Sequence, residues 1–181
     1  LLSCSPALFA TCNTRMSPPT SRVSNDSGIV LSRTYLIGFA GLGSALLLGA
    51  AFAFQAMGYA PCAMCLWQRW PHVVAIAFGA VGLILPLNTV ILAGAASALT
   101  SAGLGVFHTG VERDLWEGPA TCASGSTEGL TPEQLLEQIM TAPIVRCDEV
   151  AWQMLGLSMA SWNARASLAL AVLWLTAMRR Q

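Results

Sequence analysis

Hydrophobic residues fill four stretches of the chain, and each stretch approaches the length of a helix that crosses a bilayer. The stretches cover residues 35–59, 71–87, 90–107 and 161–178. A helix of about 20 residues, rising about 1.5 Å per residue, crosses the roughly 30 Å hydrocarbon core of a membrane. The pattern therefore predicts an all-α integral membrane protein, a bundle of four transmembrane helices spanning residues 34–178.

Small residues recur at every fourth position on two of these stretches. They are Gly41, Ala45, Gly49 and Ala53 on the first stretch and Gly94, Ala98 and Ala102 on the third. Such a stripe lets two helix backbones approach closely, although chance gives the same spacing in an Ala- and Gly-rich segment. Pro71 suits the first turn of the second helix, because an N–H there has no helical partner.

The polar parts of the chain are its two ends and one long loop. Residues 1–33 are rich in Ser, Thr and Pro and are predicted to be a disordered leader. Met16 is a candidate start of the protein, and Cys4 and Cys12 are interpreted as incidental thiols. Residues 179–181 form a short tail.

The long loop covers residues 108–160 and contains one predicted helix. Thr131 and Gln134 have the spacing of a capping box, with Pro132 at the first helical position. The apolar residues that follow fall on one side of this helix; they are Leu135, Leu136, Ile139 and Met140. The amphipathic helix can lie on the membrane surface or pack on the loop's own core, and the sequence leaves both open.

Composition agrees with a membrane protein. Hydrophobic residues make up 55% of the chain, charged residues only 10%, and the mean hydropathy is +0.60. Soluble domains carry roughly one-quarter charged residues, so this chain has too little polar surface to cover such an interior. Nine basic residues balance nine acidic ones, and no basic face suggests a nucleic acid partner.

The distribution of charge predicts the orientation in the membrane. Arginines flank both ends of the apolar region, at Arg15, Arg22, Arg33, Arg179 and Arg180, whereas all acidic residues except Asp26 lie between Glu112 and Glu149. By the positive-inside tendency both termini are cytoplasmic. The long loop then faces the outside, which in a bacterium is the periplasm, where disulfides persist.

The fourth stretch carries polar residues at its outer end. Asn163 and Arg165 lie there, and a long arginine side chain can reach the lipid headgroups. Trp162 and Trp174 are then expected near the two membrane interfaces.

Four cysteines lie on the predicted outer side, as a tight pair and a wide pair. Cys62 and Cys65 are separated by two residues, and Cys122 and Cys147 bracket much of the loop. Four cysteines can bind zinc, but only the tight pair has the usual metal-binding spacing, so no metal is expected. A structural disulfide is a good interpretation of the wide pair alone. A bridge across two residues constrains little chain, and a Cys-x-x-Cys pair is typical of redox exchange.

Two polar side chains near the tight pair are candidate partners for its chemistry. If a helix begins near Cys65, its sulfur meets the positive end of the helix dipole, and Arg69 lies one turn further on the same face. Arg69 could also simply face headgroups, and His108, at the outer end of the third stretch, could be a solvated cap. The electrons of two dithiols need an acceptor, and a lipid-soluble quinone fits an arginine and a histidine at the membrane edge.

These residues resemble a known family. The segment Cys62-Ala-Met-Cys65-Leu-Trp-Gln-Arg69 before a membrane span, and Val145-Arg-Cys147-Asp-Glu-Val150 leading to Leu155-Gly-Leu-Ser-Met159, are similar to the bacterial disulfide bond formation protein B family, DsbB. The resemblance covers about residues 35–178. One departure is Gln68, where the best-known member has Glu, which removes a salt bridge that Glu could form with Arg69.

The resemblance implies a four-helix protein of the bacterial inner membrane that reoxidises DsbA, a periplasmic thioredoxin-like protein. Electrons would pass to ubiquinone or menaquinone. It implies that the partner attacks Cys122, that Cys147 resolves this bond and exchanges with Cys62, and that Cys65 faces the quinone. Arg69 and His108 would then bind the quinone.

Two other functions use the same residues. A structural or metal-binding membrane protein, whose disulfides only hold the loop, predicts stoichiometric zinc or bridges that never exchange. A protein that runs the electrons outward, as a supply of reductant, uses the same cysteines, and only the resemblance argues against it.

Overall fold

The computed structural model describes residues 32–119, 122, 131–141 and 145–180. Most of the predicted leader therefore lies outside the described residues, as do Cys4, Cys12 and Met16. The described chain is mainly helical, with one short hairpin.

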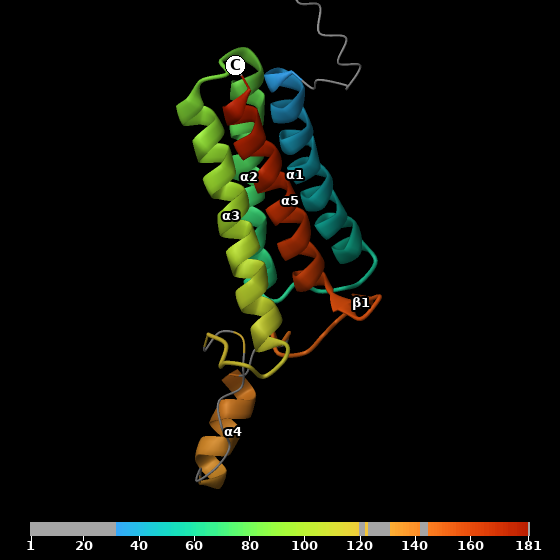
Figure 1. Cartoon of the computed structure of the whole chain (residues 1–181). Coiled ribbons are helices and arrows are strands. Elements are labelled where there is room, and N and C mark those ends of the chain that lie inside the picture. Colours follow the sequence, from blue (N-terminus) through green and yellow to red (C-terminus); the bar gives the residue numbers. More distant parts are fainter. Residues whose placement is uncertain (1–31, 120–121, 123–130, 142–144, 181) are drawn as a thin grey trace, which may run out of the picture. The chain divides into compact units, whose positions relative to one another are not determined.

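Four long helices pack side by side (Figure 1). They are α1 (Arg33–Ala56), α2 (Ala63–Ile84), α3 (Asn88–Val111) and α5 (Met159–Arg179). Helix α3 packs against α2 and α5, and α1 packs against the same two helices. Each of α2 and α5 therefore contacts both α1 and α3, and polar side chains from α2, α3 and α5 can meet inside the bundle.

Helix α2 begins eight residues before the second apolar stretch, which predicted this helix. Cys62 is its N-cap, with extended backbone, and the helix continues through Pro71. The expectation that Pro71 lies in the first turn is therefore wrong. Pro71 has no N–H to donate to the preceding turn, and the polar, aromatic segment before it hid the start of the helix from a hydrophobicity pattern.

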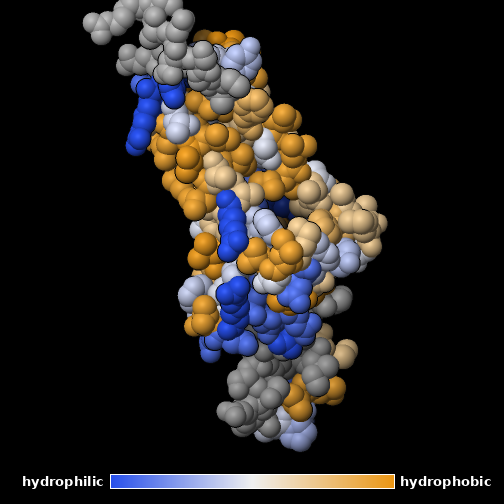
Figure 2. Space-filling model, turned by 45° about the vertical axis from the view of Figure 1, so that its right-hand side comes forward, coloured by the Kyte–Doolittle hydropathy of each residue, from blue (hydrophilic) through white to orange (hydrophobic). Residues whose placement is uncertain are grey.

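Two helices, α1 and α3, are long and apolar enough to cross a membrane by length and composition. Large apolar side chains on the long helices point outward: Tyr35, Phe39, Leu42, Leu46, Val81, Leu83, Ile84, Leu92, Leu99, Val106, Leu168 and Val172 are all exposed. Figure 2 shows hydrophobic residues gathered over the helical part of the molecule. Large exposed apolar patches are unusual on soluble monomers, so this surface agrees with contact to lipid.

Small residues fill the interior between the helices. A Cβ added to Gly79 on α2 would come 2.9 Å from the Cα of Gly41 on α1, so only glycine permits this approach. On α3, Gly94, Ala98 and Ala102 are all buried. On α1 the expected stripe holds only in part: Gly41 is buried, but Gly49 has no neighbour within 4 Å of an added Cβ.

The position of Trp174 differs from the sequence-based expectation. This residue lies in the core with no exposed surface, rather than at a membrane interface. A Cβ added to Gly94 would come 2.6 Å from its ring, so the glycine provides the space that the indole occupies. Because the sequence does not show which small residues face a tryptophan, this packing could not be foreseen.

The long loop between α3 and α5 contains helix α4 (Pro132–Thr141) and a hairpin of two short strands, β1 (Gln153–Met154) and β2 (Leu157–Ser158). In α4 the amide N–H of Gln134 donates to the Thr131 hydroxyl at 3.4 Å and the Gln134 side chain accepts from the Thr131 N–H at 3.0 Å, the reciprocal pattern of a capping box. The hairpin turn places Leu155 and Gly156 at positive φ.

The hairpin leads directly into α5. Ser158 is the N-cap of this helix, and its hydroxyl oxygen accepts from the Ser161 N–H at 3.2 Å. The same hydroxyl donates to the carboxylate of Glu112, just beyond α3. These contacts tie the start of α5 to the end of α3, beside the cysteines.

Candidate redox site

The tight cysteine pair forms the first turn of α2. The Cys62 Sγ accepts a hydrogen bond from the Cys65 backbone N–H at 3.2 Å, as an N-cap side chain does. The two sulfur atoms lie 2.8 Å apart, and neither is in a disulfide. The helix start therefore holds both sulfurs within reach of each other.

The two thiols differ sharply in acidity. The Cys62 S–H donates to the sulfur of Cys65, and this hydrogen bond is the main reason that the pKa of Cys65 falls from 9.0 to about 7. The positive charge of Arg69 lowers it further, but is a smaller cause. Sharing the same hydrogen bond, together with burial, raises the pKa of Cys62 well above its usual value. Cys65 is therefore the thiolate of the pair and Cys62 the thiol.

The wide pair is joined as a disulfide between Cys122 and Cys147. The Cys147 N–H also donates to the Cys122 carbonyl at 3.0 Å. Both side chains are fully buried, although the family resemblance implies that a partner attacks Cys122. Residues 120–121 and 123–130, on either side of Cys122, lie outside the described residues.

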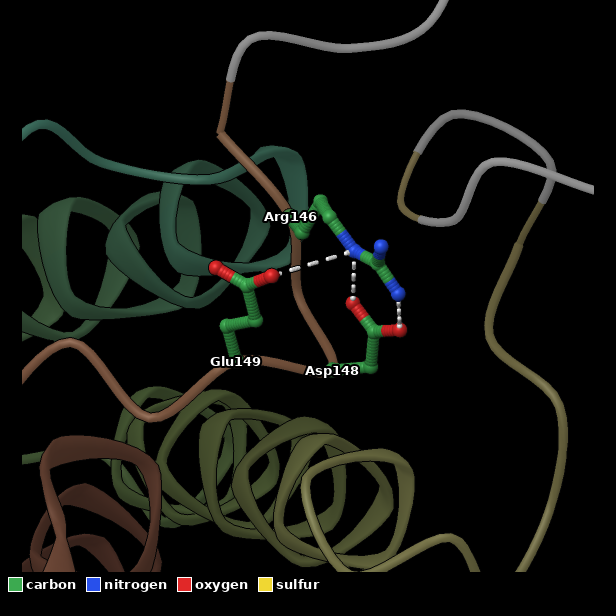
Figure 3. A network of polar contacts seen from close by, with 3 residues as sticks. All are labelled: Arg146, Asp148 and Glu149. Atoms are coloured by element: carbon green, nitrogen blue, oxygen red, sulfur yellow. Dashed lines mark hydrogen bonds and ion pairs between the residues drawn. The ribbon is translucent and has the colours of Figure 1, made fainter.

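Charged side chains flank Cys147 on both sides (Figure 3). The Arg146 guanidinium donates through Nε to the Asp148 carboxylate at 2.9 Å, makes a second contact to it through Nη2, and lies 3.6 Å from Glu149. Arg146 thus pairs with both acidic residues that follow Cys147.

The two cysteine pairs meet at Cys62 and Cys147. The sulfur atoms of these residues and a ring nitrogen of His108 all lie within 4.8 Å of one another, and all three side chains are buried. His108 comes from the last turns of α3. Two cysteines 85 positions apart in the sequence are thereby brought close together.

These three side chains also have the composition of a partial metal site. Cys147 is bound to Cys122, however, so it is not a thiolate here, and thiolates are what bind metal. The expectation that the site holds no metal stays a prediction.

A cavity of about 260 Å³ opens beside Cys65. Its walls come from α1, α2, the hairpin region and α5, and most of them are apolar, including Leu47, Phe54, Tyr59, Trp152, Met159 and Trp162. Among the described residues that line it, the polar groups are Cys65, Gln68, Arg69, His72 and Asn163. A mainly apolar pocket with a few placed polar groups is the usual form of a site for a small organic ligand.

Arg69 lies in the cavity wall but is turned partly toward α1. It donates to the Gln55 side chain at 2.8 Å and to the Ala51 carbonyl at 3.4 Å, and its guanidinium lies 4.9 Å from the centre of the Phe52 ring. Its Nε is buried without a hydrogen-bond partner among the described residues. The Nε N–H is thus among the donors of Arg69 left for a ligand.

His108 does not occur among the described residues that line the cavity. It is buried behind the tight pair, with one ring nitrogen 3.6 Å from the Cys62 sulfur and the other 2.8 Å from the Gln68 side chain. A direct contact between His108 and a cofactor stays a prediction.

Sequence reasoning did not single out His72 or Asn163 as site residues. His72 is buried, its Nε2 lies 2.9 Å from the Asn163 side chain, and its Nδ1 has no partner among the described residues. The polar residues His72 and Asn163 inside apolar stretches were the available signal, because intramembrane polar groups are rare without a role.

Gln68 faces the bundle interior rather than Arg69. Its side-chain nitrogen donates to His108, and its oxygen accepts from the Asn163 side chain at 2.8 Å. The departure from Glu at this position therefore bears on His108 and not on a salt bridge with Arg69.

Fold and site together define a helical membrane protein with a free dithiol beside a disulfide. The chain belongs to the family described as "Disulfide bond formation protein DsbB", whose model matches residues 32–177. It is thus a protein-disulfide oxidoreductase involved in disulfide bond formation.

Several relatives carry the family's name. The chain is 37% identical over 153 residues to disulfide bond formation protein B of Pasteurella multocida, covering 76% of this chain and 83% of the relative. It is 30% identical over 130 residues to disulfide bond formation protein B 2 of Pseudomonas aeruginosa, covering 67% and 76%. An uncharacterized protein of Rickettsia prowazekii is 30% identical over 119 residues, covering 63% and 69%. No solved structure matches the chain.

Proposed function

We propose that this protein reoxidises a periplasmic thioredoxin-like dithiol protein of the DsbA type and passes the two electrons to a membrane quinone, ubiquinone or menaquinone. The observation that carries the proposal is the meeting of the two cysteine pairs, with Cys62, Cys147 and His108 within 4.8 Å of one another. A purely structural disulfide has no need of a dithiol at its side.

The electrons would enter at the wide pair. A thiolate of the partner attacks the Cys122 sulfur, the Cys122–Cys147 bond breaks, and Cys147 leaves as a thiolate. Cys147 then attacks Cys62 in an oxidised Cys62–Cys65 bond, and Cys65 leaves as a thiolate with the electron pair. Thiolates are the attacking and leaving species in each exchange. Because Cys122 is fully buried here, the partner's attack requires the Cys122 sulfur to become exposed.

The relay is completed when the partner's second thiol releases Cys122. The freed Cys122 thiolate attacks Cys147, their bond re-forms, and Cys62 leaves with the electron pair and takes up a proton. The protein then holds a Cys122–Cys147 disulfide beside a Cys62, Cys65 dithiol. The structure has this same bonding pattern.

The cavity beside Cys65 suits a quinone ring. Its walls are largely apolar, and the unpartnered Nε of Arg69 offers a donor for a ring oxygen. A bound quinone supplies an acceptor for two electrons and two protons, matching one disulfide formed. The chain's own part is to keep Cys65 as a thiolate at the cavity edge and to hold Cys62 within 2.8 Å of it for the new bond.

The proposed topology has four transmembrane helices in the bacterial inner membrane, both termini in the cytoplasm and the four cysteines in the periplasm. The outward apolar side chains on all four long helices support it, as does the arginine-rich flank of the apolar region.

Purified protein in lipid nanodiscs tests the function. It is given a reduced thioredoxin-like protein and a soluble ubiquinone analogue. The protein should reduce the quinone, so the quinone absorbance should fall in proportion to the amount of partner oxidised. The Cys65→Ser variant should abolish quinone loss, while Ser97→Ala, a change at a hydroxyl bonded within its own helix, should not. Oxidation of the partner without quinone loss in the unaltered protein would overturn the assignment of the acceptor.

The alternative of a metal-binding membrane protein is favoured by the Cys62, His108, Cys147 cluster alone. Elemental analysis of the reduced protein decides this alternative: one tightly held zinc per chain that blocks disulfide exchange would support it over the relay.

A further inference from the structure

A continuous set of polar side chains, all buried except the half-buried Asn163, connects Cys62 with the cavity. It runs from Cys62 to His108, then to Gln68, Asn163 and His72, and includes Ser101 and Ser167. Gln68, His72, His108, Ser101 and Ser167 are all at most 6% exposed. Buried polar groups are costly unless they are paired, so the direction of each hydrogen bond in this set is constrained.

One backbone carbonyl fixes the direction of the whole set. The Gln68 side-chain nitrogen lies 3.3 Å from the Met64 carbonyl, and a carbonyl oxygen can only accept. The carboxamide NH₂ of Gln68 must therefore be on this side, and its second hydrogen points to His108 Nδ1 at 2.8 Å. Rotating the carboxamide by half a turn would place two acceptors, Oε1 and the Met64 oxygen, against each other.

Asn163 holds the other end of the same carboxamide. Its side-chain nitrogen donates to Gln68 Oε1 at 2.8 Å and to the Ser101 hydroxyl oxygen at 3.1 Å. Ser101 can accept because its own proton goes to the Gln68 backbone carbonyl, 3.3 Å away. Asn163 is thus fixed with its nitrogen toward Gln68, which supports the same orientation of Gln68 independently of Met64.

The protonation of His108 follows from this orientation. A neutral imidazole carries its proton on one nitrogen only, and Nδ1 accepts from Gln68, so the proton is on Nε2. Nε2 is the atom 3.6 Å from the Cys62 sulfur, within the distance of a hydrogen bond to sulfur.

We propose that Gln68, held by Asn163 and the Met64 carbonyl, is a positioning residue that keeps the proton of His108 on Nε2, so that His108 donates a hydrogen bond to the sulfur of Cys62. The proposal rests on the proposed relay for its use in exchange. In that relay, Cys122 attacks Cys147, the Cys62–Cys147 bond breaks, and the electron pair leaves on Cys62. A donor at Nε2 stabilises this leaving thiolate, whereas a bare nitrogen would repel it.

The tautomer of His108 can be measured directly, without an activity assay. The chain has two histidines, His72 and His108, so ¹⁵N-histidine labelling in nanodiscs gives two rings, assigned with a His72→Gln variant. At neutral pH the unaltered protein should show His108 with a protonated Nε2 and an unprotonated Nδ1. A proton on Nδ1 with a bare Nε2 overturns the proposal, whatever happens to the quinone reaction.

A second measurement follows the exchange. Oxidised protein is treated with a limiting amount of dithiothreitol, quenched with acid and alkylated, and the Cys62–Cys147 linked species is counted by mass spectrometry. Gln68→Leu should slow decay of this species about tenfold, the effect of losing one hydrogen bond to a charged group. Gln153→Leu, the same change at an exposed residue of β1, should leave the decay unchanged.

The outcomes separate this proposal from the proposed function. Unchanged decay in Gln68→Leu with a folded protein overturns the role of Gln68, even if quinone is reduced normally. The expected tautomer and slowed decay in a protein that never reduces quinone would support the positioning role while refuting the acceptor. If Gln68→Leu does not fold, the tautomer of the unaltered protein still decides.

Discussion

The sulfur of Cys62 donates its proton toward the sulfur of Cys65, 2.8 Å away, and the two thiols acquire opposite tendencies as a result. The pair is therefore asymmetric before any substrate arrives: one sulfur is ready to react at the cavity, and the other keeps its proton. This asymmetry arises from the hydrogen bond between the two sulfur atoms more than from the nearby arginine.

Alkylation of Cys65 should report a pKa of about 7. Because the pKa is lowered, the thiolate is present above pH 7 and is lost as the pH falls below it. At pH 7 about half of Cys65 is thiolate, against about 1% for a thiol of pKa 9, but a thiolate of lower pKa is about tenfold less nucleophilic. Iodoacetamide should therefore react about fivefold faster than with an ordinary thiol. The pH profile of labelling, followed by mass spectrometry, measures the midpoint.

Cys62→Ala should move that midpoint upward, because the hydrogen bond from Cys62 is the largest cause of the low value. Arg69→Leu should move it less, since the arginine is a smaller cause. If Arg69→Leu raised the midpoint more than Cys62→Ala, the order of these two effects would be reversed and the account of the pair would be wrong.

Arg69→Lys should weaken quinone binding while sparing the exchange between the cysteine pairs. Lysine keeps the charge but lacks the Nε donor of the planar guanidinium. We expect the KM for the quinone to rise about tenfold, consistent with about 1.4 kcal/mol for one lost hydrogen bond, with little change in the rate of partner oxidation in a single turnover. Arg165→Lys, at an exposed position of α5, is the matched control and should leave the KM unchanged.

Replacing Cys147 by Ser should trap the partner on Cys122. Without its mate, Cys122 is a free thiol whose thiolate attacks the disulfide of an oxidised partner, releasing the partner's second sulfur as a thiolate. Cys147 is not there to displace the partner, so the mixed disulfide is no longer resolved within the chain. Cells that express the variant should contain a covalent adduct, sensitive to reductant, that joins Cys122 to a soluble periplasmic protein. A Cys122→Ser, Cys147→Ser double variant should lack the adduct, and an adduct at Cys65 instead would contradict the proposed order of the relay.

Gly79→Ala should destabilise the bundle by about 1–3 kcal/mol, the usual cost of overpacking. Its Cβ would lie 2.9 Å from the Cα of Gly41, which belongs to a helix backbone and cannot move freely. Gly49→Ala, at a position with no neighbour within 4 Å of the added atom, should be neutral or slightly stabilising. Thermal unfolding in detergent compares the two, and equal midpoints would argue against the close contact of α1 and α2.

Much of this arrangement was open to prediction because it depends on local pattern. The apolar stretches predicted the four long helices, and the spacing of Thr131 and Gln134 predicted the start of α4. The tight cysteine pair and Arg69 could be identified as candidate site residues from their spacing in the sequence alone. Each of these features needs only a few neighbouring residues to define it.

The rest depends on contacts between distant segments. The meeting of Cys62 with Cys147, the turn of Gln68 away from Arg69, and the burial of Trp174 against Gly94 all follow from how α2, α3 and α5 face one another. Hydrophobicity patterns also placed the start of α2 too late, since polar and aromatic residues surround the tight pair. No local spacing in a single sequence shows these contacts between distant segments.

Glycine, alanine and serine make up much of the bundle's interior, beside a few large residues such as Ile37 and Trp174, while many large apolar residues of the long helices lie outside. Mutational tolerance should follow the same division. Outward positions such as Leu42, Leu99 and Val172 need only remain apolar, so a random library should accept Leu, Ile, Val, Phe or Met there. Inward positions such as Gly41, Ala98 and Ser101 should accept almost nothing larger. Positions on the lipid-facing surface of this fold should therefore vary in sequence, whereas interior positions should keep the same residue or one of similar size.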